Sequence, residues 1–121
     1  MTLAPATVAT DVAEWVTVCH LDRLTPNRGA AALVEGEAVA VFRLSTGELY
    51  AIGNVDPFSG ASVLSRGIVG DAAGVPTVAS PMYKQHFDLR TGACLEEPSR
   101  AVAVYPVREA GGVVSVGPIP R

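Results

Sequence analysis

Short stretches of alternating apolar and polar residues fill most of this chain, and glycine, proline or small polar residues separate them. A period of two residues is typical of β-strands that bury one face. The pattern predicts strands at residues 14–19, 30–34, 37–44, 48–53, 77–80, 86–89, 93–95, 102–108 and 113–116. One helical turn is expected at 20–24, and a loop with a brief strand at 68–69 is expected across 54–75. No βαβ rhythm is present, so the predicted fold is an all-β antiparallel sandwich.

The stretch 37–44 shows the alternation most clearly. One face of this strand is expected to carry Val39, Val41 and Arg43, and the other face Ala40, Phe42 and Leu44. A tight turn at Glu35-Gly36 joins it to the preceding strand. Further along, Asp88 and Arg90 flank a predicted hairpin turn, and we expect them to stabilise it.

Composition narrows the class of protein. The 121 residues suit one compact domain, which we place at 11–121 behind a loose leader of small residues at 1–10. Hydrophobic residues make up 49% of the chain and charged residues 17%, which is typical of a folded core and argues against disorder. The net charge of −3 does not provide the excess of basic residues that is typical of nucleic-acid-binding proteins. No apolar run is long enough to span a membrane, so no membrane partner is expected.

Two cysteines and two histidines are present, and their placement does not suggest a metal site. Cys19 and His20 are neighbours, so on a strand their side chains point to opposite faces. We expect Cys19 to be a small core residue, Cys94 to be half exposed, and both thiols to be reduced in a cytoplasmic protein. Neither His20 nor His86 has the acid and nucleophile that a catalytic triad needs, so both are expected to be structural or surface residues.

Two loops carry the most specific signal. Residues 80–92 read S-P-M-Y-K-Q-H-F-D-L-R-T-G, which resembles the second cluster-binding loop of Rieske iron–sulfur proteins, C-P-x-H-G-x-x-F-D-x-x-T-G. Residues 56–60 read D-P-F-S-G and are followed by L-S-R-G, where the first Rieske loop reads C-x-H-x-G and then L-S-x-G. All four ligand positions of the pattern are replaced, by Asp56, Phe58, Ser80 and Tyr83.

The replacements are decisive chemically. A Rieske [2Fe–2S] centre needs two thiolates on one iron and two imidazoles on the other. Aspartate, serine and tyrosine offer hard oxygen donors and phenylalanine offers none, whereas iron–sulfur chemistry selects thiolate. We therefore expect no catalytic residue, no metal and no cofactor in this chain.

The chain resembles one family of degenerate Rieske domains, the small subunit of assimilatory NAD(P)H-dependent nitrite reductase. The resemblance lies in W-V-T-V-C at 15–19, A-I-G-N-V-D-P-F at 51–58 and S-P-M-Y-K-Q-H-F-D-L at 80–89. It implies a Rieske-like β-sandwich with a small loop subdomain and no redox centre. It also implies a partner, the large subunit, which carries FAD, a [4Fe–4S] cluster and sirohaem and reduces nitrite to ammonium in the cytoplasm.

The loop residues can be interpreted in two ways. Phe58 is expected to fill the space of the missing cluster, or to present an apolar tip to a partner. Tyr83, Lys84 and Gln85 are, with Phe58, candidates for the partner interface, because tyrosine is enriched at interfaces and a lysine there should point outward. The alternative is a solvated loop in which Tyr83 is hydrogen-bonded to Asp56.

Two other functions remain open at this point. A stand-alone Rieske-like interaction module would have the same fold and a different partner. A ferredoxin-type electron carrier would need unusual ligands, and the donor set argues against it.

Overall fold

The computed structural model describes residues 15–117 and is built from short antiparallel strands, as the sequence pattern predicts. The first sheet contains β1 (Val16–His20), β10 (Val113–Val116) and β9 (Val107–Ala110), in that order. The second contains β2 (Arg28–Val34), β3 (Glu37–Arg43), β4 (Leu49–Gly53) and β8 (Val104–Tyr105). The third contains β5 (Ile68–Ala72), β6 (Val75–Ala79) and β7 (His86–Asp88). Two 3₁₀ turns, η2 (Leu21–Arg23) and η3 (Leu64–Arg66), lie between strands.

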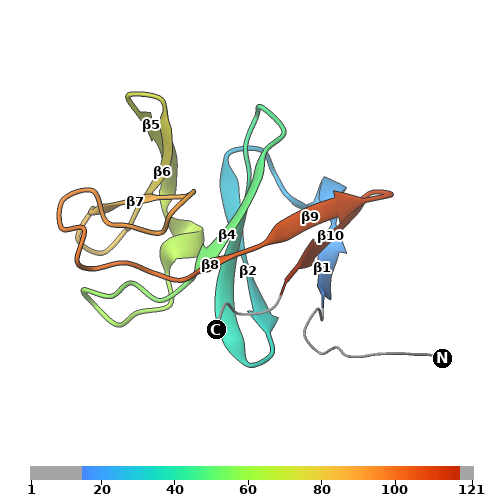
Figure 1. Cartoon of the computed structure of the whole chain (residues 1–121), viewed down its shortest axis with the longest axis horizontal. Helices are drawn as coiled ribbons and strands as arrows, with labels where there is room; N and C mark the ends of the chain where they lie inside the picture. The colour runs from blue at the N-terminus through green and yellow to red at the C-terminus, as the bar shows by residue number, and fades with distance from the viewer. Residues whose placement is uncertain (1–14, 118–121) are drawn as a thin grey trace.

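The second sheet is the middle layer of the molecule (Figure 1). Its β3 contributes Val39 and Val41 to a core shared with Val114 and Val116 of the first sheet. The opposite face of β3 contributes Ala40 and Phe42 to a second core under the third sheet, and Leu44, just after the strand, joins them. The predicted alternation along this strand is confirmed, and it explains how one strand supports two cores.

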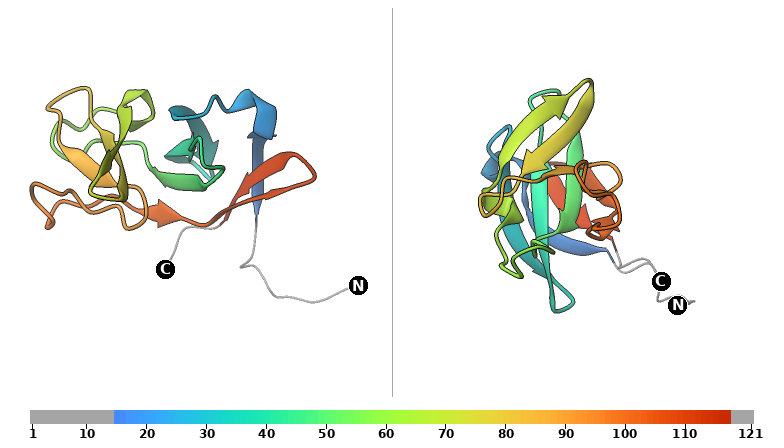
Figure 2. Two further views of the ribbon diagram at one scale, coloured as in Figure 1. Left: turned by 90° about the horizontal axis from the view of Figure 1, so that it is seen from above. Right: turned by 90° about the vertical axis from the view of Figure 1, so that its left-hand side faces the viewer.

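We call residues 54–101 the cap and the remainder of the described chain the base. The cap holds β5, β6 and β7 with the connecting loops, and lies on the opposite side of the second sheet from β1, β9 and β10 (Figure 2). In the base, Val16 pairs with Val116 across β1 and β10, so the chain enters and leaves the base at one place. Arg43 closes the base by donating from Nη1 to the carbonyl oxygens of Leu21 and Leu24, at 3.2 and 3.1 Å.

Three strand predictions were inexact. Instead of a brief strand at 68–69, β5 runs from Ile68 to Ala72 and pairs with β6 throughout, so the stretch 54–75 is not mainly loop. The predicted strand 93–95 is reduced to two isolated bridges, one between Phe87 and Cys94 and one between Ala93 and Ala101. The predicted strand 102–108 is divided at Pro106, which has no N–H to donate, so β8 pairs with β4 and β9 pairs with β10.

Close packing requires glycine at two positions of the Rieske-like motif, Gly67 and Gly92. A Cβ on Gly67 would collide with the carbonyl oxygen of Ala79, and one on Gly92 would collide with that of Val102. Gly92 also has a φ of 79°, which favours glycine. The requirement for these glycines comes from neighbouring backbone atoms and does not depend on a bound cluster. The predicted leader at 1–10 lies outside the described residues, and no helix within 15–117 is long and apolar enough to cross a membrane.

Candidate functional site

The two loops of the Rieske-like motif meet in the cap. The first loop (residues 54–62) follows β4, and the second loop (residues 80–85) connects β6 to β7. Asp56 of the first loop is fully buried, and its Oδ2 accepts a hydrogen bond from the Ser80 hydroxyl at 2.5 Å. Its Oδ1 accepts the backbone N–H of Phe58 at 2.7 Å. The two positions that cysteine occupies in the Rieske pattern are thus joined directly to each other.

Ser80 also organises the second loop around itself. Its hydroxyl oxygen accepts the backbone N–H of Met82 at 3.2 Å. Its own N–H donates to the Gln85 carbonyl at 2.9 Å, and its carbonyl accepts the Lys84 N–H at 3.0 Å. A single buried residue therefore closes the loop at its base and fastens it to the first loop.

Asn54 is a site residue that was not singled out from the sequence, although it opens the N-x-D-P-F motif. It is buried, and its Nδ2 donates to the Ser62 hydroxyl at 2.8 Å while its Oδ1 accepts the Ser65 N–H at 2.7 Å. These two bonds close the first loop against η3. A buried amide that is fully engaged in this way stabilises the loop conformation.

Phe58 packs against the buried cluster under the third sheet, which we call the cap core. Its ring is half-buried, and its centroid lies 6.3 Å from that of Phe87. The guanidinium of Arg100 lies over the outer face of the ring, 5.2 Å from the centroid, and Nη1 donates to the Pro57 carbonyl at 3.0 Å. Arg100 is a second residue that the sequence did not reveal, since 42 positions separate it from the ring that it covers.

Tyr83 behaves differently, because its side chain is 59% exposed. Among the hydrogen bonds of residues 15–117, none joins Tyr83 to Asp56, so the alternative in which these two side chains bond is wrong. The reason is that the Asp56 carboxylate faces inward toward Ser80 and the amide of Phe58. Met82, next to Tyr83, is also 47% exposed.

Lys84 has an unusual backbone conformation. Its φ is 66°, in the left-handed region, and its side chain is exposed. A residue with a Cβ costs roughly 1 kcal/mol there relative to glycine. Gln85 is half-buried, and its Oε1 is the buried side-chain oxygen that has no hydrogen-bond partner within residues 15–117.

The second loop is followed by a small polar cluster around Glu96. One oxygen of this carboxylate lies 2.7 Å from His86 Nδ1, and the other accepts the His86 backbone N–H at 2.8 Å. Cys94 is fully buried beside it, so the prediction of a half-exposed thiol is wrong; the bridge to Phe87 pulls it into the cap core. Burial raises the pKa of both free thiols, Cys94 and Cys19, so neither has the lowered pKa that is typical of a reactive cysteine.

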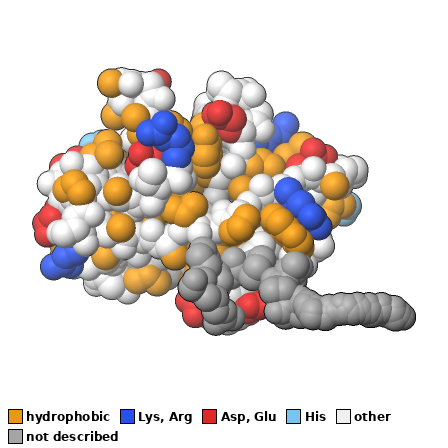
Figure 3. All heavy atoms as spheres, in the orientation of Figure 1, with side chains coloured by type: hydrophobic (Ala, Val, Ile, Leu, Met, Phe, Trp, Pro, Cys, Tyr) orange, Lys and Arg blue, Asp and Glu red, His pale blue; other side chains and the backbone are white. Residues whose placement is uncertain are grey.

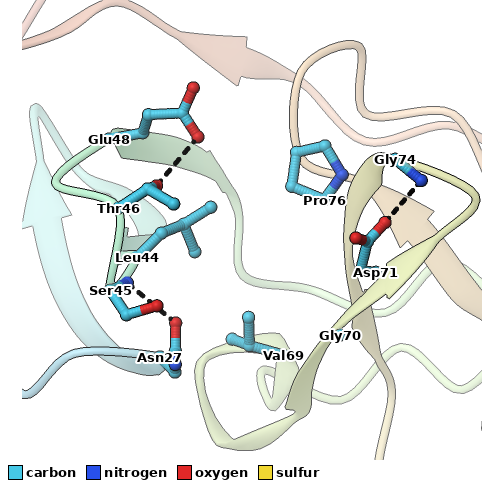
Figure 4. Close-up of a pocket in the computed structure, with 10 residues that line it drawn as sticks. All are labelled: Asn27, Leu44, Ser45, Thr46, Glu48, Val69, Gly70, Asp71, Gly74 and Pro76. Carbon is cyan, nitrogen blue, oxygen red and sulfur yellow. Dashed lines mark hydrogen bonds between the residues drawn. The ribbon is translucent and has the colours of Figure 1, made fainter.

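The cap-to-base boundary contains a cleft of about 390 Å³ with mixed polar and apolar lining, away from the two loops (Figure 4). One wall comes from the turn after β3 and the other from the β5–β6 hairpin. Its two carboxylates already have partners: Glu48 accepts from the Thr46 hydroxyl at 3.2 Å, and Asp71 accepts from the Gly74 N–H at 2.6 Å. These groups stabilise the turns that carry them.

The residues at the four ligand positions do not fit a [2Fe–2S] cluster. Asp56 and Ser80 use their oxygens on each other, Phe58 has no donor atom, and Tyr83 faces solvent. No group of three or more His, Cys, Asp or Glu side chains converges within the described part of the chain. A Rieske centre requires thiolate and imidazole ligands, and this donor set supplies neither.

Comparison with known proteins identifies the family. The Rieske-like [2Fe-2S] domain family matches residues 14–117. The nitrite reductase (NADH) small subunit of Salmonella typhimurium is 42% identical over 106 residues, which cover 87% of this chain and 98% of that protein. The nitrite reductase [NAD(P)H] large subunit of Klebsiella oxytoca contains a segment 41% identical over 103 residues, covering 85% of this chain and 11% of that protein.

Solved structures agree with these matches. The crystal structure of a proposed NADH-dependent nitrite reductase small subunit from Mycobacterium tuberculosis superposes with a TM-score of 0.87 at 48% identity, covering 92% of this chain and all of that one. The ferredoxin of carbazole 1,9a-dioxygenase from Nocardioides aromaticivorans superposes with a TM-score of 0.72 at 32% identity, over 86% of this chain and 97% of its own. The chain therefore belongs to the Rieske-like [2Fe-2S] domain family and, within it, to the nitrite reductase small subunits.

Proposed function

We propose that this chain is the cofactor-free small subunit of a cytoplasmic NAD(P)H-dependent nitrite reductase that reduces nitrite to ammonium during nitrogen assimilation. The observation that carries the proposal is the buried hydrogen bond between Asp56 and Ser80. Two side chains at the cysteine positions that bond to each other leave no thiolate and no free coordination site for iron. Electron transfer is then assigned to FAD, [4Fe–4S] and sirohaem on the large subunit.

The partner proposed is that large subunit. The small-subunit relatives support it, and so does the Klebsiella oxytoca large subunit, in which a similar domain is part of a longer chain. In this proposal the chain contributes a folded surface rather than a chemical group. A domain with its loops fixed by buried hydrogen bonds loses little conformational entropy when it docks.

A ferredoxin-type electron carrier is the second candidate, because the fold is shared with the carbazole dioxygenase ferredoxin. It requires iron and labile sulfide in the isolated chain. The oxygen and hydrocarbon side chains at the ligand positions weigh against it. A stand-alone interaction module would have to bind some protein other than a nitrite reductase.

The test begins with the tagged chain in its native host, grown on nitrite as sole nitrogen source. We expect near-stoichiometric recovery of a large flavin- and sirohaem-containing polypeptide. Recovery of a different protein, or of none, would remove the assignment to nitrite reduction. Iron and sulfide analysis of the same chain, purified without air, should find neither, and stoichiometric iron with sulfide would establish the carrier instead.

A deletion strain addresses whether the subunit is required. We expect nitrite turnover and growth on nitrite to fall when the chain is absent, and to return when it is supplied on a plasmid. Full turnover by the large subunit alone would show that docking serves no purpose in the reaction or in assembly.

A further inference from the structure

We infer that the tip of the second loop, Met82-Tyr83-Lys84, is the surface that docks on the large subunit, and that it enters an apolar recess with a carboxylate at its rim. The inference rests on the proposed function and adds the contact face and its chemistry. Four independent features of the tip support it: exposed apolar area, backbone conformation, rigidity and charge.

The first feature is exposed apolar area in consecutive residues. Met82 and Tyr83 are both large and about half exposed, although they are adjacent on a loop that the fold otherwise holds tightly. Leu95, another exposed apolar residue of the cap, donates its N–H to the carbonyl of His86, just after this loop. Single exposed apolar residues are ordinary, but tyrosine and methionine together on a fixed tip are typical of a buried contact in a complex.

The second feature is the conformation of Lys84. Its φ of 66° would suit glycine better, and no ion pair within residues 15–117 uses its ammonium group. The fold therefore gains nothing visible from lysine at this position. Strain that brings no internal contact points to a contact outside the chain. Strain alone is not specific, since Ala73 in the β5–β6 turn has a φ of 53°, but Ala73 has no exposed aromatic neighbour.

The third feature is rigidity. Ser80 fixes the loop through its hydrogen bonds to Asp56, Met82, Lys84 and Gln85. The backbone of the tip is thus held in one conformation before it meets a partner. Pre-organisation of this kind raises affinity by lowering the entropy lost on binding.

The fourth feature is charge. Lys84 is the single charged residue of the loop 80–85, in a chain with a net charge of −3. On the face shown in Figure 3, charges of both signs are interspersed, with no broad patch of one sign. A lone cation beside exposed apolar groups suits a local carboxylate rather than a large acidic surface, and it should contribute to the rate and specificity of docking.

The experiment measures binding of purified large subunit to the complete chain and to three variants, by calorimetry or surface capture. Tyr83→Ala should weaken binding by roughly 10-fold or more, as for an anchoring aromatic residue. Lys84→Gly should raise the melting temperature, because the left-handed strain is relieved, and yet weaken binding several-fold. Ala73→Gly is the matched control, and it should leave the dissociation constant unchanged. Binding by the unaltered chain should weaken with added salt more than binding by Lys84→Gly.

The outcomes separate the two proposals. If the unaltered chain binds the large subunit and both tip variants bind equally well, the tip is not the contact, while the proposed function stands. If the unaltered chain does not bind, the subunit assignment fails and this inference fails with it. A rise in melting temperature together with weaker binding for Lys84→Gly distinguishes a contact from a structural role, because a structural lysine would not show opposite signs.

Discussion

Each loop of the cap has one replaced cysteine position and one replaced histidine position, but the replacement side chains of the two loops point in different directions. In the first loop, Asp56 is fully buried and Phe58 packs beneath Arg100, so both replacements are directed into the molecule. In the second loop, Ser80 is directed inward, but Tyr83 is directed outward into solvent. The residues at the cysteine positions therefore bind each other, and the residues at the histidine positions separate.

The difference shows how this fold can hold its two loops when the ligand positions carry other residues. A cluster links two loops by covalent bonds, and its removal leaves both a gap and two unsupported loops. Here a hydrogen bond replaces the link, and the Phe58 ring occupies space beside Phe87. The Phe58 ring of the first loop is thus packed within the cap, whereas Met82 and Tyr83 at the tip of the second loop are exposed.

The largest effect is expected for Asp56→Ala, which removes the hydrogen bond between the two loops. It leaves the buried Ser80 hydroxyl and the Phe58 N–H without their acceptor, and should lower the free energy of unfolding by ~3 kcal/mol. Urea unfolding of the purified chain measures this. Asp56→Asn retains one acceptor and should cost less. A loss below about 1 kcal/mol for Asp56→Ala would mean that the link between the loops is dispensable.

Truncation of the two aromatic residues compares the loops directly. Phe58→Ala removes a half-buried ring from the cap core and should cost ~2 kcal/mol of unfolding free energy. Tyr83→Ala should change it by no more than about 0.5 kcal/mol, because its side chain faces solvent. Thermal unfolding of both variants and of the unaltered chain measures these differences in stability. Equal destabilisation would contradict the division into an inward and an outward loop.

The smallest effect concerns pH and tests whether the cap responds to acid. Burial acts to raise the pKa of Asp88, but hydrogen bonds from the side chain and N–H of Arg90 outweigh it, so the pKa lies below the ordinary 3.8. A carboxyl whose pKa is lower in the folded state stabilises the fold above its unfolded pKa, and this stabilisation is lost as the pH falls through the folded value.

The stability of the unaltered chain should accordingly decline below about pH 4, and Asp88→Asn should show a shallower decline over the same range. Urea midpoints measured from neutral pH down to about pH 2 give both slopes. Identical slopes would show that other carboxyl groups control acid unfolding.

Much of this architecture could be predicted from the sequence, where the signal is local. The period of two along β3 correctly assigned Val39 and Phe42 to opposite faces, because each face packs a separate core. The Rieske-like motif is contiguous within each loop, and the structure brings two of its replaced positions, Asp56 and Ser80, into direct contact. Asp88 and Arg90 were expected to stabilise their turn, and they do so through an ion pair at 3.2 Å.

What could not be predicted depends on contacts between distant residues. β5 contains Gly70 and Asp71, which are poor strand formers, and it forms because β6 provides a pairing partner. The acceptor of the Ser80 hydroxyl lies 24 positions away, so nothing near Ser80 indicates it. Cys94 lies close to Glu96 and Glu97 in the sequence, and its burial depends on its bridge to Phe87 and on packing in the cap core.

The pairing of Val16 with Val116 has a consequence for gene architecture. Because both ends of the folded unit emerge side by side on the sheet opposite the cap, a short peptide linker can join the unit to another polypeptide, or even insert it within one, without disturbing the loops of the cap. A similar segment does occur within a longer polypeptide, the Klebsiella oxytoca nitrite reductase large subunit.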